Sequence, residues 1–176
     1  MLHTKKVTKE LKEYNEIISI YHSSFPEDER LPVWLINLFS MRKKIYFLAF
    51  FDASKFLGFS YIFQDEEQSF VLYLATDPSL RSEGYGSKIL AWIKENSPSH
   101  NIALNIETVD KKFDNYEQRL KRLHFYQKNE YFDTQLRISE EGNSYSILAN
   151  SAQFSKEKYS RLIKQFSFGL YRPKFV

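Results

Sequence analysis

The chain has 176 residues, of which 43% are hydrophobic and 27% are charged, and its formal net charge at pH 7 is +3. This length and composition fit one globular domain spanning residues 1–176 and exclude a disordered chain. The mild charge argues against a nucleic-acid partner, because basic and acidic residues are interspersed. No apolar run approaches the roughly 20 residues of a membrane span, so we expect no membrane partner.

Cysteine is absent, so no disulfide framework is expected. The charged N-terminal sequence has no secretory apolar region, and cytoplasmic residence is the simplest expectation. Four scattered histidines without cysteine partners predict no metal site. Most of the 16 Phe and 12 Tyr residues are expected in the core.

Hydrophobic periodicity predicts helices and strands along the whole chain. In chain order they are helix 11–25, helix 32–41, strands 45–51, 56–63 and 70–76, helix 86–96, strand 102–107, a helix around 116–123, strands 131–138 and 144–151, and a last helix capped by Ser155. The segment Leu2–Val7 is a candidate for an extra short strand. Strand 70–76 is apolar on both faces, which predicts a central position in a sheet. The order predicts a mixed α/β (α+β) fold.

A glycine-containing loop, Arg81-Ser82-Glu83-Gly84-Tyr85-Gly86, lies between strand 70–76 and the following helix. Glycine permits positive φ and close backbone approach, and amides at a helix N-terminus can hold phosphate. Both a dinucleotide fingerprint and a P-loop would need another residue type where Ile89 stands. The loop therefore predicts a site for a phosphorylated cofactor that is neither a dinucleotide-binding fingerprint nor a P-loop.

The pattern Arg-x-x-Gly-x-Gly, preceded by residues 74–80, resembles the acetyl-CoA motif of the GCN5-related N-acetyltransferase (GNAT) superfamily. Residues 122–132 resemble the later motif of that superfamily, Phe/Leu-Tyr-x-Lys-x-Gly-Phe, and residues 24–30 resemble the start of a subgroup of small bacterial acetyltransferases. Two positions depart from the family pattern, Ser82 and Glu130, where glycine is common. The resemblance implies a central, mostly antiparallel twisted sheet of six to seven strands with helices on both faces. It also implies that strand 70–76 splays from the strand of Ala103 to admit the cofactor.

The resemblance implies acetyl-CoA as cofactor. It places the cofactor-binding residues at the end of the central strand and in the loop: Leu74, Ala75, Thr76, Arg81, Ser82, Glu83, Gly84, Tyr85, Gly86 and Ser87. Tyr126 matches the family's general acid, and a phenol with a reference pKa of about 10 is protonated at neutral pH. Glu107 is the best-placed general base, although it could instead be solvated or paired with Lys111 or Lys112. His124 is a weaker candidate base and is expected to be exposed.

The implied function is an N-acetyltransferase that transfers an acetyl group from acetyl-CoA to a primary amine by direct attack. No cysteine is present to form an acyl-enzyme. The amine can belong to a small molecule or a peptide, and the acidic loops 27–29 and 65–67 are candidates to attract it. Two alternatives stay open, a non-catalytic CoA-binding module and a purely structural or peptide-binding domain. Phe166, Phe168 and Tyr171 are candidates for a homodimer contact.

Overall fold

The computed structural model describes residues 2–140 and 142–176. The chain divides into two compact units, one of residues 1–63 and 71–93 and the other of residues 64–70 and 94–176. Within the described residues, no helix combines the length and the apolar character that a membrane span needs.

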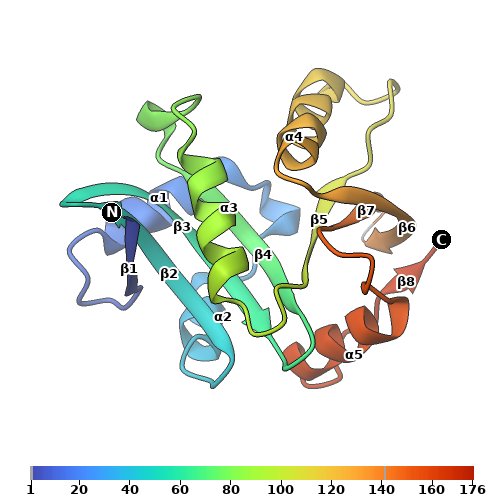
Figure 1. The fold of residues 1–176 in the computed structure, drawn as a ribbon, viewed down its shortest axis with the longest axis horizontal. Coiled ribbons are helices and arrows are strands. Elements are labelled where there is room, and N and C mark those ends of the chain that lie inside the picture. The colour runs from blue at the N-terminus through green and yellow to red at the C-terminus, as the bar shows by residue number, and fades with distance from the viewer. Residues whose placement is uncertain (1, 141) are drawn as a thin grey trace. The chain divides into compact units, whose positions relative to one another are not determined.

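The first unit is built on four neighbouring strands of the sheet (Figure 1). In sheet order they are β1 (Leu2–Lys6), β2 (Ile45–Asp52), β3 (Lys55–Gln64) and β4 (Ser69–Thr76). β1 and β2 pair antiparallel, as do β2 and β3. The predicted extra strand at the N-terminus is therefore present.

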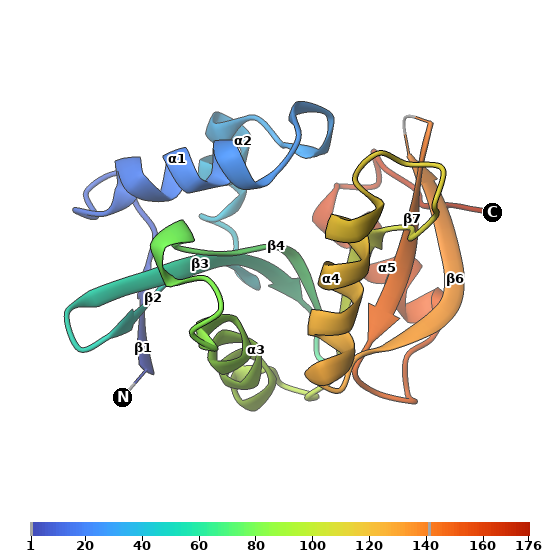
Figure 2. The same ribbon diagram turned by 90° about the horizontal axis from the view of Figure 1, so that it is seen from above.

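Three helices cover these strands: α1 (Tyr14–Ser24), α2 (Val33–Phe39) and α3 (Tyr85–Asn96). Figure 2 shows α1 and α2 on one face of the strands and α3 on the other. Between them lies a core rich in aromatic side chains, as the composition predicts; its fully buried members include Tyr21, Phe47, Phe50, Phe51, Phe59 and Tyr61. On the α3 side, the ring of Trp92 meets Phe50 edge-on, with 5.3 Å between the ring centroids.

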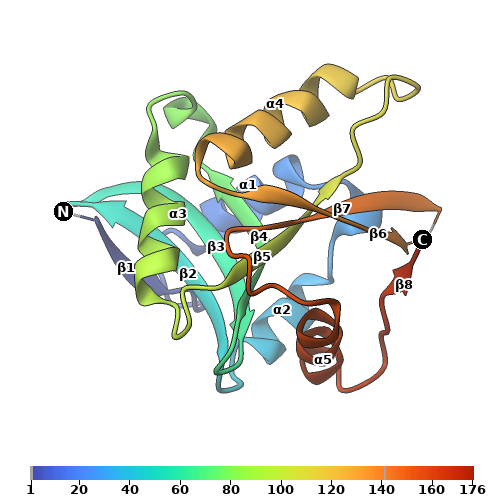
Figure 3. The same cartoon turned by 45° about the vertical axis from the view of Figure 1, so that its right-hand side comes forward.

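The second unit contains β5 (Ile102–Glu107), β7 (Asn143–Ala149), β6 (Phe132–Glu140) and β8 (Lys174–Phe175), in that sheet order. The pairings β5–β7, β7–β6 and β6–β8 are all antiparallel. Its helices are α4 (Tyr116–Lys128) and α5 (Lys156–Phe166), drawn above and below the strands in Figure 3. The Ser155 hydroxyl accepts a hydrogen bond from the Lys158 N–H, which confirms the predicted cap.

The mixed α/β class and the element order are confirmed, but among the described residues the sheet has eight strands instead of six to seven. The unpredicted strand is β8, whose two residues pair with Ile138 and Ser139. A strand this short carries no alternation that a sequence pattern can detect. Single 3-10 turns at Glu27–Glu29 and Pro78–Leu80 also went unpredicted, since both lie in segments expected to be loops.

Burial raises the pKa of six tyrosines above the usual value of 10: Tyr21, Tyr61, Tyr126, Tyr131, Tyr159 and Tyr171. For Tyr126 and Tyr171 the pKa reaches about 12. The unfolded chain releases these protons near pH 10 while the folded chain retains them, so their contribution to stability is complete below pH 10 and is lost as the pH rises through 12. We expect the ionisation of these six buried tyrosines, measured by tyrosinate absorbance, to coincide with the loss of the circular dichroism signal at alkaline pH. Full tyrosine ionisation near pH 10 with unchanged circular dichroism would contradict this burial.

Candidate active site

The end of β4, where Leu74, Ala75 and Thr76 were predicted to contact the cofactor, lies against a glycine of β3. Gly58 has a φ of +151°, and a Cβ at this position would lie 2.3 Å from the Ala75 carbonyl oxygen and 2.7 Å from the Thr76 Cα. The next residue after β4 is also tied to β3, because the Asp77 N–H donates to the Leu57 carbonyl over 2.8 Å. No side chain fits at position 58, so this glycine sets the path of the backbone at the end of β4.

Between β4 and α3 the chain makes a short, locally stabilised connection. The Asp77 carboxylate accepts hydrogen bonds from the Ser79 N–H and hydroxyl, both over 2.8 Å, and so starts the 3-10 turn Pro78–Leu80. Two later residues have left-handed backbone, Ser82 with φ +69° and Gly84 with φ +80°. Ser82 thus adopts a conformation that glycine accepts more readily, at the position where many relatives have glycine.

The loop and the first turn of α3 present a group of unused backbone donors. Five N–H groups donate no hydrogen bond within the described part of the chain, namely those of Ser82, Gly84, Tyr85, Gly86 and Ser87. The first bond of the helix is made one residue later, from the Lys88 N–H to the Gly84 carbonyl over 3.2 Å. No atom lies within 4 Å of the position that a Gly84 Cβ would take, so this side of the loop is open. Free N–H groups at the start of a twelve-residue helix can hold an anion.

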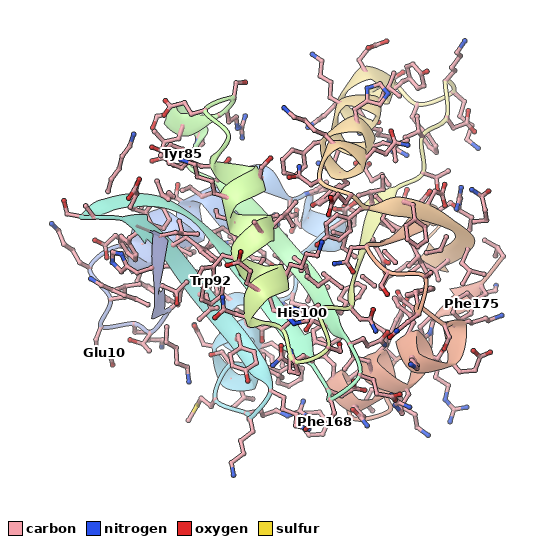
Figure 4. All side chains as sticks on the ribbon, viewed as in Figure 1. Glu10, Tyr85, Trp92, His100, Phe168 and Phe175 are labelled. Carbon is pink, nitrogen blue, oxygen red and sulfur yellow. The ribbon has the colours of Figure 1, made fainter. Side chains whose placement is uncertain are left out.

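Two lysines that the sequence reasoning missed flank this loop. The Tyr85 ring, labelled at the top of α3 in Figure 4, has the ammonium groups of Lys55 and Lys88 at 5.4 Å and 4.9 Å from its centroid. The Lys55 ammonium also lies 3.9 Å from the Glu83 carboxylate. Lys88 could have been found from its place in the first turn of the helix. Lys55 could not, because it reaches the loop only through the turn between β2 and β3.

In the second unit, the predicted general acid Tyr126 is in the last turn of α4 and is only 8% exposed. Its ring packs against Phe125 and Tyr131, with centroids 5.1 Å and 5.7 Å away. Burial raises the pKa of Tyr126 to about 12, although the nearby Arg122 charge acts in the opposite direction. Its hydroxyl makes no hydrogen bond to any residue that the structure describes. The side chain therefore stays protonated and keeps its O–H available as a donor.

The turn after Tyr126 forms without the glycine that the family usually has there. Glu130 takes that place with a left-handed φ of +67°. The Tyr126 carbonyl accepts from both the Asn129 and the Tyr131 N–H, each over 3.0 Å, and so ends the helix. The Glu130 carboxylate also pairs with the Lys94 ammonium over 2.9 Å. The left-handed cap is thus retained, at a cost of about 1 kcal/mol for a residue other than glycine.

Glu107, the predicted general base, ends β5 and already has several partners. Its Oε1 lies 2.8 Å from Arg119 Nη2 and 3.3 Å from Asn115 Nδ2, and its Oε2 lies 3.2 Å from Arg122 Nη1. Arg119 is buried, and it also donates to the Asn115 side chain and the Thr108 carbonyl. The partners are arginines of α4, and not Lys111 or Lys112. These contacts favour a role in holding α4 against the end of β5, and the role as base stays a prediction.

We expect Glu107→Gln to lower the free energy of unfolding by about 1–3 kcal/mol, because the buried Arg119 guanidinium loses its charged partner. Chemical denaturation with the pH–rate profile recorded on the same variant separates the two roles. A stability loss with an unchanged acidic limb identifies a structural residue, whereas a lost acidic limb identifies the base. Asp110→Asn is a suitable control, since Asp110 pairs with Lys112 over 3.1 Å on the surface of the same unit.

The remaining candidates from the sequence are His124, the metal ligands and the two acidic loops. His124 is exposed on α4, as expected. No cluster of metal-ligand side chains occurs among residues 2–140 and 142–176. Asp65 and Glu67 pair with Arg161 of α5, and Glu67 also pairs with Lys158, so these acids help to fix that helix. In the acidic turn Glu27–Glu29 of the first unit, Glu27 and Asp28 are exposed and Glu29 is half-buried, and the Tyr73 hydroxyl donates to the Glu29 carbonyl over 2.9 Å.

The predicted residues therefore fall into two groups. The first unit brings together the loop 81–87 and the end of β4, and adds Gly58, Lys55 and Lys88. The second unit holds Tyr126 and Glu107. Arg122 forms an ion pair with Glu107, and its charge also acts on the pKa of Tyr126.

The model of the acetyltransferase (GNAT) family matches residues 12–131. Among solved structures, a GNAT-family protein from Bacteroides thetaiotaomicron is 19% identical over 96% of this chain and 99% of its own, with a TM-score of 0.77. An aminoglycoside 6'-N-acetyltransferase complexed with coenzyme A is 14% identical over 84% of this chain and 95% of its own, with a TM-score of 0.64. A GNAT-family acetyltransferase from Elizabethkingia anophelis with acetyl-CoA bound is 11% identical over 84% and 96% of the two chains, with a TM-score of 0.58.

Comparison with curated proteins finds no match. At these identities the structural similarity establishes the fold, and the family rests on the sequence model, which covers well over half of the chain. The resemblance predicted from the two motifs is thereby confirmed. This chain belongs to the acetyltransferase (GNAT) family.

Proposed function

We propose that this acetyltransferase transfers an acetyl group from acetyl-CoA to a primary amine by direct attack of the amine. The main support is the group of five unused N–H donors in the loop 81–87 and the first turn of α3. Two of the structural relatives contain CoA or acetyl-CoA. The absence of cysteine leaves direct attack as the simplest route, because no thiol is available to carry the acetyl group.

The residues of the loop fit the diphosphate of CoA. The free N–H groups would donate to its oxygens, and the open side at Gly84 leaves room for the backbone to approach. Lys55 and Lys88 add positive charge beside the loop, and Arg81 is exposed on the same segment. Backbone groups of Leu74, Ala75 and Thr76 would bind the acyl end, where a donated N–H stabilises developing negative charge. When bound, acetyl-CoA supplies an activated thioester.

In this proposal Tyr126 protonates the departing thiolate. Its hydroxyl has no partner among the described residues, and its pKa of about 12 keeps it protonated at any physiological pH. The attacking amine must lose a proton, and Glu107 or a water molecule would accept it. Positioning of the thioester and the amine supplies much of the remaining rate enhancement.

The acceptor in this proposal is the amine of a small molecule or a peptide, and the protein acts in the cytoplasm without nucleic acid. The acidic turn Glu27–Glu29 would favour a cationic acceptor. A homodimer contact through the C-terminal aromatics would rely on Phe168, which is 62% exposed, more than on the half-buried Phe166 and Tyr171.

Thermal denaturation in the presence of CoA, acetyl-CoA or NAD tests the proposal. Acetyl-CoA and CoA should raise the midpoint progressively with concentration, as mass action requires, and NAD should not. Amines are then screened for acetyl-CoA-dependent thiol release. A midpoint unmoved by millimolar acetyl-CoA would refute the proposal. A shift without turnover on any amine class would favour the non-catalytic CoA-binding alternative.

A further inference from the structure

The first unit has an open edge at β1. This strand is the first in the sheet order and pairs with β2, from Leu2 opposite Asp52 to Lys6 opposite Leu48. Within the described residues, no strand lies along its other side. An edge strand presents backbone N–H and C=O groups that a further extended segment can pair with.

Next to the end of β1 the surface is hollowed by about 550 Å³. The hollow is lined by the last residue of β1 and by the segment that leads into β2. Its lining includes Lys6, Met41, Arg42, Lys43, Lys44 and Tyr46. Four of its lining residues are cationic and none is acidic. Met41 is 78% exposed and Tyr46 is 38% exposed, so apolar surface lies beside the charges.

The charged side chains that line the hollow are all cationic. Its lining includes Lys6, Arg42, Lys43 and Lys44 and no Asp or Glu, while Asp52 lies at the other end of β1, opposite Leu2. Such a field attracts anionic partners and repels cationic ones. A second copy of the chain docked through a two-fold axis would bring the same cations face to face. Charge complementarity therefore favours an acidic partner over self-association.

The neighbouring surface has the composition of a protein interface. On α2, Trp34 and Leu38 are 67% and 52% exposed. Leu38 follows Trp34 by four residues, and Met41 follows Leu38 by three, so this helical spacing gives one apolar stripe that ends at the hollow. Trp, Tyr, Met and Arg are the residue types enriched where proteins bind each other. An open backbone edge is of use to a polypeptide and of none to a bilayer or a nucleic acid, because these have no strand to add.

We propose that the β1 edge and the basic hollow form a docking site for an extended, acidic polypeptide segment that also carries apolar side chains. Its backbone would pair with β1, its carboxylates would face the cations of Lys6, Arg42 and Lys43, and an apolar side chain would cover Met41 and Tyr46. Side chains alternate along a strand, so acidic and apolar residues at alternate positions suit this surface. The site is separate from the loop 81–87, and the proposed function does not depend on it.

Fluorescence anisotropy with a labelled peptide of alternating glutamate and valine tests the site on the full chain. We expect saturable binding that weakens as salt is added, because exposed charges are screened. The double variant Lys6→Glu with Lys43→Glu should weaken binding by about tenfold or more. The control, Lys121→Glu with Lys164→Glu, makes the same charge change on exposed positions of α4 and α5 and should stay within about twofold. Equal loss in both variants would overturn the site.

The backbone contact has its own test. Methylating alternate peptide nitrogens removes the donors on one edge of the added strand but retains every carboxylate, and we expect this peptide to bind about tenfold more weakly. Undiminished binding would overturn strand addition. Tighter binding of anionic phosphatidylglycerol vesicles or of single-stranded DNA than of the unmodified peptide would also overturn the proposal, in favour of a general anion-binding surface. Circular dichroism confirms that each variant is folded, and an unchanged acetyl-CoA midpoint confirms that the cofactor site is intact.

Discussion

Gly84→Val abolishes acetyl-CoA binding while the protein stays folded; this is the largest effect that we expect. Apart from its two chain neighbours, the Cβ position of Gly84 meets no described atom within 4 Å, so a side chain there would project into open space at the loop that carries the free N–H groups. The φ of +80° adds about 1–2 kcal/mol of backbone strain for valine. Isothermal titration calorimetry with acetyl-CoA measures the binding, and thermal denaturation without ligand measures the strain.

Gly142→Val is the matched control. Gly142 has a φ of +86°, and its Cβ position is equally free of atoms within 4 Å, but it lies at the turn between β6 and β7. The two valine variants should lose similar stability, and only the Gly84 variant should lose the cofactor. Wild-type affinity in Gly84→Val would mean that the loop does not hold the diphosphate. Equal loss of affinity in both variants would trace the effect to unfolding.

Tyr126→Phe should lower kcat about 100-fold or more and leave acetyl-CoA binding near normal, since a positioned general acid typically contributes a factor of 10²–10⁴. The ring contacts with Phe125 and Tyr131 survive the change, and the hydroxyl has no hydrogen bond to lose within the described chain. The variant therefore keeps its stability. Single-turnover measurements of thiol release, combined with calorimetric titration of acetyl-CoA, separate chemistry from binding.

Tyr131→Phe controls for the loss of a neighbouring hydroxyl. The Tyr131 hydroxyl is buried without a hydrogen-bond partner among the described residues, so its removal should preserve turnover and relieve an unsatisfied polar group. If the turnover of Tyr126→Phe matched that of the wild type, Tyr126 would not be the general acid. If Tyr131→Phe alone slowed the reaction, the acid would be the second tyrosine of this motif.

Local sequence signals predicted most of the fold because most helices and strands have a characteristic pattern within a short stretch of sequence. The apolar spacing of α1 before Pro26, the alternation in β5 and the Ser155 cap of α5 are signals of this kind. β8 carries no such signal, because two residues become a strand only by pairing with β6. The position of the loop 81–87 between a strand and a helix was likewise predictable, and its role in holding phosphate stays a prediction.

The partners of the site residues could not be predicted in the same way. Glu107 has its charge partners 12 and 15 residues later in the chain, on α4, and only the fold brings Arg119 and Arg122 to it. The sequence offered Lys111 and Lys112 because they are near in sequence. Lys55 was missed in the same way, because it is distant in sequence from the loop 81–87 and only the pairing of β2 with β3 brings it there. Spacing along the chain identifies which residues can act, and tertiary contacts decide what they meet.

Gly58 has a consequence for engineering this enzyme. The path of the backbone at Ala75 and Thr76 is set by a contact between two main chains, with no side chain between them. Libraries that vary the side chains of residues 74–76 will therefore change what lines the acyl end of the proposed donor site, for example to accept longer acyl groups, while the strand keeps its course. Position 58 itself should be held constant in any such library, since even alanine there would push β4 aside.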